Sequence, residues 1–367
     1  MASEPTAGEQ MVGRIPVRNL WLLMLYASEL TRYRDRFNAL VEADFDDLPD
    51  MVARLLAEAV EFRLRRNLTR GYRNRQMALT RVRGRIDILT TEARLLLSRG
   101  EVFCRFQELT IDTPRNRLVR AALDLMARVV GEVGLGQRCR ALACILARSG
   151  VGGLRPPRTE LALDQFGRND DGDRFMVALA HLAFDLALPT EVSGSTALVA
   201  PEREEHWVRR LFQSAVLGFA RAELKPLGWS VRGGLSLHWQ VTTTSDGIAE
   251  ILPKMVTDIV LDPPPGGRRV VVDTKFASIL ESRRFGGDSL KSGYIYQMYA
   301  YVRSQEGLGV QWDDATGLFL HPAIGKTIYE HVKIQGHSIT FATVDLTGTT
   351  AAIRSELRGI LGRHSYT

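Results

Sequence analysis

Apolar residues at helical spacing dominate the first half of the chain. They recur three and four positions apart through residues 20–30 and 51–68, and again through 116–133, 137–149 and 173–187. Each stretch carries one apolar stripe, which is the pattern of a helix that buries one face. We therefore predict that this half is mostly helical.

One segment of the first half departs from that pattern. Residues 77–89 are rich in threonine, valine and isoleucine around Gly84. β-Branched residues bounded by turn formers predict an extended strand with a turn. The helical half therefore carries a small β element.

A domain boundary is expected near the middle of the chain. The length of 367 residues favours two domains. Around 188–201, large side chains are scarce and turn formers lie at both ends. We expect a disordered tail at 1–13, an N-terminal domain at 14–190 and a C-terminal domain at 195–367.

The second half mixes helical and strand patterns. The loop at 262–267, DPPPGG, joins two strand-like segments, which predicts neighbouring antiparallel strands. Helices are expected at 204–221, 292–304 and 350–361, and strands at 229–241, 254–261, 269–276, 317–321, 327–334 and 338–345. The expected fold class is α+β, with a helical first domain and a second domain in which helices pack on a sheet.

Composition narrows the class of protein. With 45% hydrophobic and 25% charged residues, the chain has the balance of a globular protein. Its longest apolar run, 20–27, is too short to span a membrane and lacks the flanks of a signal peptide. The three cysteines show no pairing or zinc-ligand spacing. We expect a cytoplasmic protein without membrane contact.

Positive charge is concentrated in one short segment. The net charge is +6, and residues 61–85 hold nine arginines against the single acid Glu61. Arginine suits phosphate because its planar fork donates two hydrogen bonds to one anion. Arg63, Arg66 and Arg83 are therefore candidate DNA contacts. An equally good interpretation is a solvated face whose compensating acids are brought near by folding.

Three ionisable residues interrupt apolar strands in the second half. Asp258 lies in VTDIVL, and Asp273 and Lys275 lie two apart in VVVDTKF, so the latter two share one face of the sheet. Two carboxylates on adjacent strands can hold Mg²⁺, while a lysine nearby orients water and stabilises phosphate charge. This set suits phosphodiester hydrolysis. The alternative is a surface ion pair worth less than about 1 kcal/mol.

Two flanking helices offer further candidates. Gln297 and Tyr301 are four apart, so they share a face of the helix that follows the strand. We assign Gln297 a supporting role in catalysis and Tyr301 a weaker one in DNA contact. Glu204 and Glu205 open the first helix of this half, and Glu205 is a candidate third metal ligand. Acids also favour the first turn of a helix because of its dipole.

These residues resemble the PD-(D/E)xK nuclease superfamily. Asp258 matches its first acidic position, Asp273-Thr274-Lys275 matches (D/E)-x-K, and Gln297 to Tyr301 resembles the Q-x-x-x-Y motif of several branches. Thr257 stands where the family name expects proline, which is not a ligand. The resemblance implies a restriction-endonuclease-like α/β/α domain with a mixed sheet. It also implies a Mg²⁺ cofactor that Mn²⁺ can replace.

Segments of the first half narrow the resemblance to the McrC family. They are RIPVRNLWLLMLYA (14–27), TRVRGRIDI (80–88) and CRFQELTIDTPRNRLVRAAL (104–123). The resemblance implies a nuclease subunit of a 5-methylcytosine restriction complex that cuts double-stranded DNA. It also implies an McrB-like AAA+ GTPase ring as partner, which the N-terminal part docks into and stimulates. The chain itself carries no GxxxxGKS nucleotide loop.

Two other functions stay open at the level of the sequence. One is a DNA-repair nuclease of the same superfamily that acts alone. The other is a non-catalytic activator of a motor NTPase that keeps the nuclease fold only as a scaffold. The intact Asp258, Asp273 and Lys275 argue against the second.

Overall fold

The computed structural model divides the chain into two compact units. It describes residues 11–12, 15–33, 48–167, 170–194, 201–282, 288–323 and 326–363. Unit 1 combines Met1–Leu48 with Leu188–Thr367, and unit 2 is Pro49–Ala187. The division at Leu188 falls where the sequence suggests a boundary, but the first 48 residues group with the second half of the chain. The predicted ranges 14–190 and 195–367 do not show this return of the N-terminal segment.

Of the predicted N-terminal tail at residues 1–13, the structure describes residues 11 and 12. Residues 1–10 lie outside the described part of the chain. Met11–Val12 forms strand β1, which pairs antiparallel with β2 at Ile15–Pro16. Residues 11–12 therefore belong to a paired strand, whereas the sequence suggested a disordered tail there.

Unit 2 is built mainly from helices, as the spacing predicts. They are α3 (Leu48–Arg65), α5 (Pro114–Val129), α6 (Val133–Arg148), α7 (Arg158–Leu163) and α8 (Asp171–Gly194). Helix α5 begins at Pro114 because the Thr113 side chain accepts from Asn116 N and proline suits the first helical position. Arg115, only 4% exposed, ties α5 to Asp164, Asp170 and Asp173 at 2.6, 3.1 and 3.3 Å. A buried charge needs this compensation.

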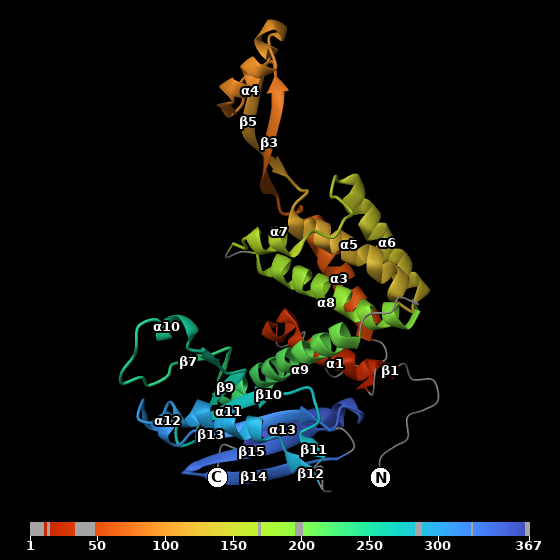
Figure 1. The fold of residues 1–367 in the computed structure, drawn as a ribbon. Helices are drawn as coiled ribbons and strands as arrows, with labels where there is room; N and C mark the ends of the chain where they lie inside the picture. Colours follow the sequence, from red (N-terminus) through yellow and green to blue (C-terminus); the bar gives the residue numbers. More distant parts are fainter. Residues whose placement is uncertain are drawn as a thin grey trace. The chain divides into compact units, whose positions relative to one another are not determined.

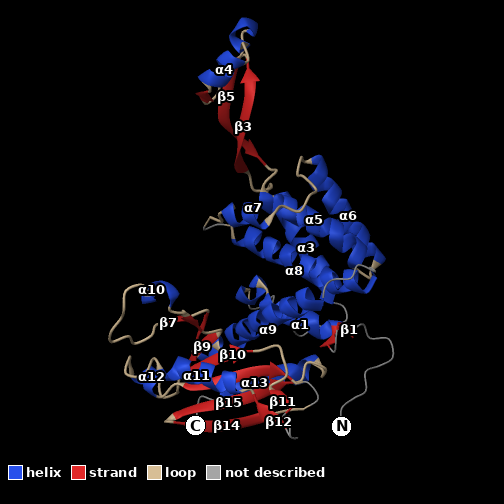
Figure 2. Cartoon of the chain, viewed as in Figure 1, coloured by secondary structure: helices blue, strands red, loops and turns tan. Residues whose placement is uncertain are grey.

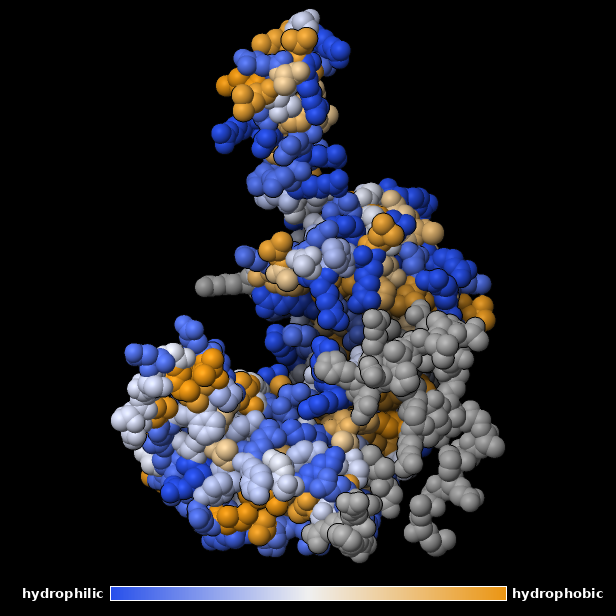
Figure 3. Space-filling model, in the orientation of Figure 1, coloured by the Kyte–Doolittle hydropathy of each residue, from blue (hydrophilic) through white to orange (hydrophobic). Residues whose placement is uncertain are grey.

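A β arm extends from these helices (Figures 1 and 2). Strands β3 (Gly71–Leu79) and β5 (Val102–Thr110) pair antiparallel over their full length, and β4 (Arg85–Ile86) pairs with β5. Helix α4 (Ile88–Ala93) and the short η3 (Leu96–Arg99) complete its tip. Exposed apolar side chains gather on the tip (Figure 3): Val82, Ile88, Leu89, Leu95 and Leu97.

Unit 1 centres on a six-stranded sheet. Its order is β14-β15-β13-β10-β9-β6. The strands are β6 (Ser230–Gly233), β9 (Ile259–Asp262), β10 (Val270–Thr274), β13 (Thr316–Pro322), β14 (Tyr329–Ile334) and β15 (His337–Val344). β10, β13 and β15 run parallel while the other pairs are antiparallel. The α+β class with a mixed sheet is thus confirmed, including the antiparallel pair around DPPPGG.

Shorter elements and helices complete unit 1. The helical elements are α1 (Val17–Ala27), η1 (Glu29–Arg32), α9 (Pro201–Glu223), η4 (Lys225–Leu227), α10 (Ile248–Ile251), α11 (Ser292–Arg303), α12 (Val310–Asp313) and α13 (Thr350–Gly362). Two short antiparallel strand pairs are β7 (Ser236–Leu237) with β8 (Met255–Val256), and β11 (Leu280–Ser282) with β12 (Asp288–Leu290).

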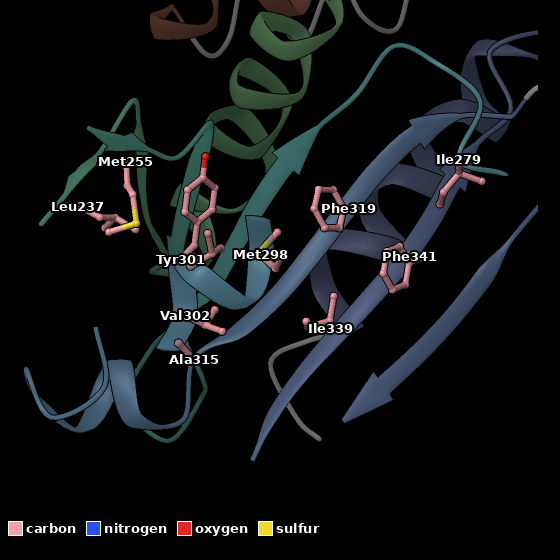
Figure 4. Close-up of a cluster of buried hydrophobic side chains, with 11 residues drawn as sticks. Leu237, Met255, Ile279, Met298, Tyr301, Val302, Ala315, Phe319, Ile339 and Phe341 are labelled. Carbon is pink, nitrogen blue, oxygen red and sulfur yellow. The ribbon is translucent and has the colours of Figure 1, made fainter. Parts of the chain in front are cut away.

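Helix α11 covers one face of the sheet. Its Met298 and Val302 join Val271, Phe319 and Phe341 in a buried cluster (Figure 4). Gly317 is required there because a Cβ on it would overlap the Met298 side chain. Since Asp273 pairs with Phe319 in register, its side chain lies on this same face. The sheet and α11 together position the site.

Helices α1 and α9 explain why the N-terminal segment belongs to unit 1. A Cβ on Gly218 of α9 would overlap the Tyr26 carbonyl oxygen of α1, and the Tyr26 and Phe219 rings meet edge to face at 5.1 Å. Buried Asn19 donates to Leu346 O at 2.8 Å and to Gly348 O at 3.0 Å. These contacts anchor α1 to the second half of the chain.

Candidate active site

The hairpin of β9 and β10 brings the two predicted aspartates together. Val272 pairs with Ile259, so the next step along the hairpin sets Asp273 beside Asp258. Asp258 Oδ2 accepts from both Thr274 N and Thr274 Oγ1 at 2.8 Å. The strand that carries Asp273 therefore also fixes the orientation of Asp258.

Asp273 is the most buried charge of the site. It is 2% exposed, and its Oδ2 lies 2.8 Å from Lys275 Nζ. Burial raises the pKa of Asp273 to about 6, although the Lys275 ammonium acts to lower it. The ion pair is buried on the site face, so the alternative of a solvated surface pair does not hold.

Gln297 and Tyr301 form a chain of hydrogen bonds behind Asp273. Gln297 Nε2 lies 3.0 Å from Asp273 Oδ1 and 2.8 Å from the Tyr301 hydroxyl oxygen. The Tyr301 hydroxyl in turn donates to Val256 O at 3.0 Å. Gln297 thus braces the aspartate, a contact that the sequence could not specify.

Tyr301 does not occupy the DNA-facing position that the sequence suggested. Its ring is 8% exposed and lies beside Met298 in the buried cluster (Figure 4). Burial raises the pKa of its hydroxyl. Its hydrogen-bonding capacity is directed to Val256 and Gln297, so its role is structural.

Gln213 is a site residue that the sequence analysis missed. It lies on α9, and its Nε2 donates to Asp258 Oδ1 at 2.8 Å. Glu204 and Glu205 lie on the same helix, but their side chains are outside the described part of the structure. Glu205 is eight residues before Gln213, about 12 Å along the helix axis.

The side chains at the site fit a hard divalent cation. Asp273 Oδ2 is buried, and its partner within the described residues is the ammonium of Lys275 at 2.8 Å. The same residues hold no group of three or more His, Cys, Asp or Glu side chains that could bind a metal. Two carboxylates with water completing the shell are the donors that Mg²⁺ commonly takes. Asp258 and Asp273 would be the ligands.

The three candidate DNA-binding arginines lie in unit 2 and have different surroundings. Arg63 Nε pairs with the buried Asp173 at 2.9 Å, so its charge is compensated. The exposed Arg66 guanidinium stacks over Phe62 at 4.6 Å, and that of Arg83 over Phe106 at 4.3 Å. Folding thus supplies the compensating acid for Arg63, which argues against a DNA contact there.

Acids also meet the arginines of the arm. Arg73 pairs with Asp112 at 3.2 Å, and Arg75 pairs with Glu108 at 2.8 Å. Within the described residues, Arg81, Arg83 and Arg85 have no acid at ion-pair distance. Part of the uncompensated positive charge of the cluster therefore lies toward the arm tip.

Sequence comparisons identify the relatives of the chain. The family model "McrBC 5-methylcytosine restriction system component" matches residues 4–152. Over 352 residues the chain is 25% identical to the Escherichia coli K12 protein "Type IV methyl-directed restriction enzyme EcoKMcrBC", covering 95% of this chain and 98% of the relative. The chain is thus similar to components of McrBC restriction systems. The match to the Escherichia coli protein runs through both units, and the family model lies in the part of the chain that carries the arm.

Two solved structures also match. The chain is 14% identical, with a TM-score of 0.41, to a chain of the refined half-complex from the tetradecameric assembly of Thermococcus gammatolerans McrB AAA+ hexamers with bound McrC. That match covers 86% of this chain and 68% of the other. A second, the Thermococcus gammatolerans McrBC complex, matches at 16% identity and a TM-score of 0.33 over 48% and 58%. Within the described residues, no helix has the length and apolar content to cross a membrane.

Proposed function

We propose that this McrC-like chain is the DNA-cutting subunit of a modification-dependent restriction complex. The observation that carries the proposal is the convergence of Asp258, Asp273 and Lys275 at the end of one hairpin. Two carboxylates and a lysine held this way are the groups that hydrolysis of a phosphodiester requires. The reaction proposed is endonucleolytic cleavage of double-stranded DNA carrying 5-methylcytosine, in the cytoplasm.

Each residue of the site has a distinct role in this proposal. Asp258 and Asp273 would hold Mg²⁺, or Mn²⁺ in its place, which polarises the phosphodiester and lowers the pKa of a bound water. Gln213 and Gln297 orient the two carboxylates. Lys275, held 2.8 Å from Asp273, donates toward the attacked phosphate and stabilises its developing charge.

We further propose that target choice and motor force come from a partner, an McrB-like AAA+ GTPase ring. The family match to a component of the McrBC system covers residues 4–152, which include the whole arm. The arm ends in exposed apolar side chains and uncompensated arginines, a composition suited to a protein interface. It is the element of unit 2 that we assign to docking and to stimulation of the partner's GTPase.

The test compares Asp273→Asn with Asp246→Asn, which removes an exposed carboxylate of the same unit. Each full-length variant is reconstituted with the partner GTPase, and cleavage of methylated plasmid and GTP hydrolysis are both measured. Asp273→Asn should lower the cleavage rate by roughly a thousandfold, since a metal contributes several kcal/mol and each 1.4 kcal/mol is tenfold. Asp246→Asn should cut like the wild type, and both should stimulate GTP hydrolysis.

Each alternative function gives a different result. Cleavage at the wild-type rate by Asp273→Asn would show that the catalytic assignment is wrong. Efficient cutting by the wild-type chain alone with Mg²⁺ would favour a stand-alone repair nuclease. GTPase stimulation without any cleavage by the wild type would favour a non-catalytic activator.

A further inference from the structure

Helix α9 directs a second polar side chain toward the candidate site. Arg209 precedes Gln213 by four residues, so the two share one face of the helix. Gln213 identifies that face, because its side chain reaches Asp258 at 2.8 Å. Phe212 of the same turn meets Phe276, just after Lys275, with ring centroids 5.8 Å apart. Arg209 therefore lies about one helical turn from the carboxylates.

The charge of Arg209 lies on the face of α9 from which Gln213 contacts Asp258. The side chain is exposed, and among the described residues it makes no ion pair or hydrogen bond. Two other arginines of the unit are paired instead: Arg269 binds Asp262 and Arg358 binds Glu223.

The site lacks positive charge of its own for a DNA strand. Asp258 and Asp273 carry two negative charges, and the ammonium of Lys275 is paired with one of them. Before a divalent cation binds, a polyanionic strand lying across the site would meet net repulsion from these three groups. An additional cation beside the carboxylates would offset that repulsion, and a guanidinium can donate two hydrogen bonds to one phosphate.

We propose that Arg209 binds a backbone phosphate of the DNA next to the one that is cut, and so positions the strand over Asp258 and Asp273. This inference rests on the proposed nuclease function. It adds a phosphate contact on α9 to a site otherwise built from the hairpin and α11. Arg210, the next residue, is also exposed but points about 100° away around the helix, so it serves as a matched control.

The experiment uses the full-length wild type, Arg209→Ala, Arg209→Lys and Arg210→Ala. Binding of a fluorescent duplex is measured in Ca²⁺ buffer from low to moderate salt, and cleavage is measured with the partner present. Arg209→Ala should weaken binding about tenfold to a hundredfold, the range for one charged hydrogen bond. Its plot of log affinity against log salt should be shallower by about 0.9. Arg209→Lys should be intermediate, and Arg210→Ala should match the wild type.

Several results would overturn the inference. Equal salt dependence for Arg209→Ala and Arg210→Ala would exclude a specific phosphate contact, as would a wild type that binds no duplex at low salt. Slower cleavage by Arg209→Ala with unchanged binding would mean that Arg209 acts only through Asp273. If the wild type binds but does not cut with its partner, the proposed function fails, while the binding comparison still decides the role of Arg209.

Discussion

At the scale of single residues, two glutamines orient the two aspartates of the site. Gln213 reaches Asp258 from α9, and Gln297 reaches Asp273 from α11. An amide donates a hydrogen bond to a carboxylate without adding charge. A carboxylate at either position would repel the aspartates and raise the already elevated pKa of Asp273. The neutral side chains therefore preserve the ionised form that a cation needs.

The role of Gln213 can be tested by Gln213→Ala, with Ser214→Ala as a control on an exposed neighbouring position. Loss of the amide frees one oxygen of Asp258, so that among the described residues Thr274 alone still holds the carboxylate. We expect kcat for plasmid cleavage to fall about tenfold, because one charge-assisted hydrogen bond is worth about 1.5 kcal/mol or more. Duplex affinity in Ca²⁺ should stay near the wild-type value. An equal loss of kcat in both variants would refute the assignment.

The sequence was sufficient to predict Asp258, Asp273 and Lys275, because polar residues inside apolar strands are conspicuous and period two fixes their face. It was insufficient for Gln213. Nothing in the local sequence distinguishes this polar residue from the others that border the apolar stripe of a helix. Its partner Asp258 lies 45 positions away. Tyr301 was misplaced for a related reason, since the pattern shows which residues share a face but not which face is buried.

At the scale of elements, the arm is the feature that the sequence revealed least. A strand with a turn was predicted at 77–89, but β5 at Val102–Thr110 was not. Its alternating exposed and buried side chains include Arg105 and Glu108, which obscure the apolar pattern of a strand. Helices with full stripes, such as α5 and α9, were predicted within a few residues of their observed ends.

Gly84 controls how the arm tip folds. It has φ of +70°, and a Cβ there would lie 2.5 Å from Arg105 O. Gly84→Ala should therefore both strain the backbone and push β4 away from β5. Gly100 has a similar φ of +69°, but a Cβ added there would meet no atom within 4 Å. Gly100→Ala therefore introduces the backbone strain without the steric clash.

We expect amide hydrogen exchange around residues 83–87 and 103–106 to be faster in Gly84→Ala than in Gly100→Ala. The difference should reach about tenfold, corresponding to an overpacking cost of at least 1 kcal/mol. If the arm tip docks onto the GTPase, Gly84→Ala should also reduce GTPase stimulation more than Gly100→Ala does. Identical exchange in the two variants would contradict the close approach of β4 to β5.

At the scale of the whole molecule, the chain returns on itself to complete unit 1. The sequence predicted a helix near 20–30 but assigned it to the N-terminal domain, because position along the chain was the sole guide. Contacts between residues far apart in the sequence place this helix in unit 1. Asn19 donates a hydrogen bond to Leu346 O, and α1 packs on α9. Since α9 also carries Arg209 and Gln213, the N-terminal helix supports the site from outside the sheet.

Gly218 offers a direct test of that support. Gly218→Ala would drive a methyl group into the Tyr26 carbonyl of α1, and overpacking of this kind costs about 1–3 kcal/mol. Gly359→Ala is the matched control, because Gly359 lies in α13 with no atom near a Cβ. The control should gain about 0.5–1 kcal/mol from the higher helix propensity of alanine. Because Gly218 also lies in a helix, the propensity gain is common to both variants, and urea denaturation should separate them by the overpacking cost of about 1–3 kcal/mol in unfolding free energy. Gly218→Ala should also slow plasmid cleavage, because displacing α9 moves Gln213 from Asp258. Equal stability of the two variants would mean that α1 does not pack against α9 in solution.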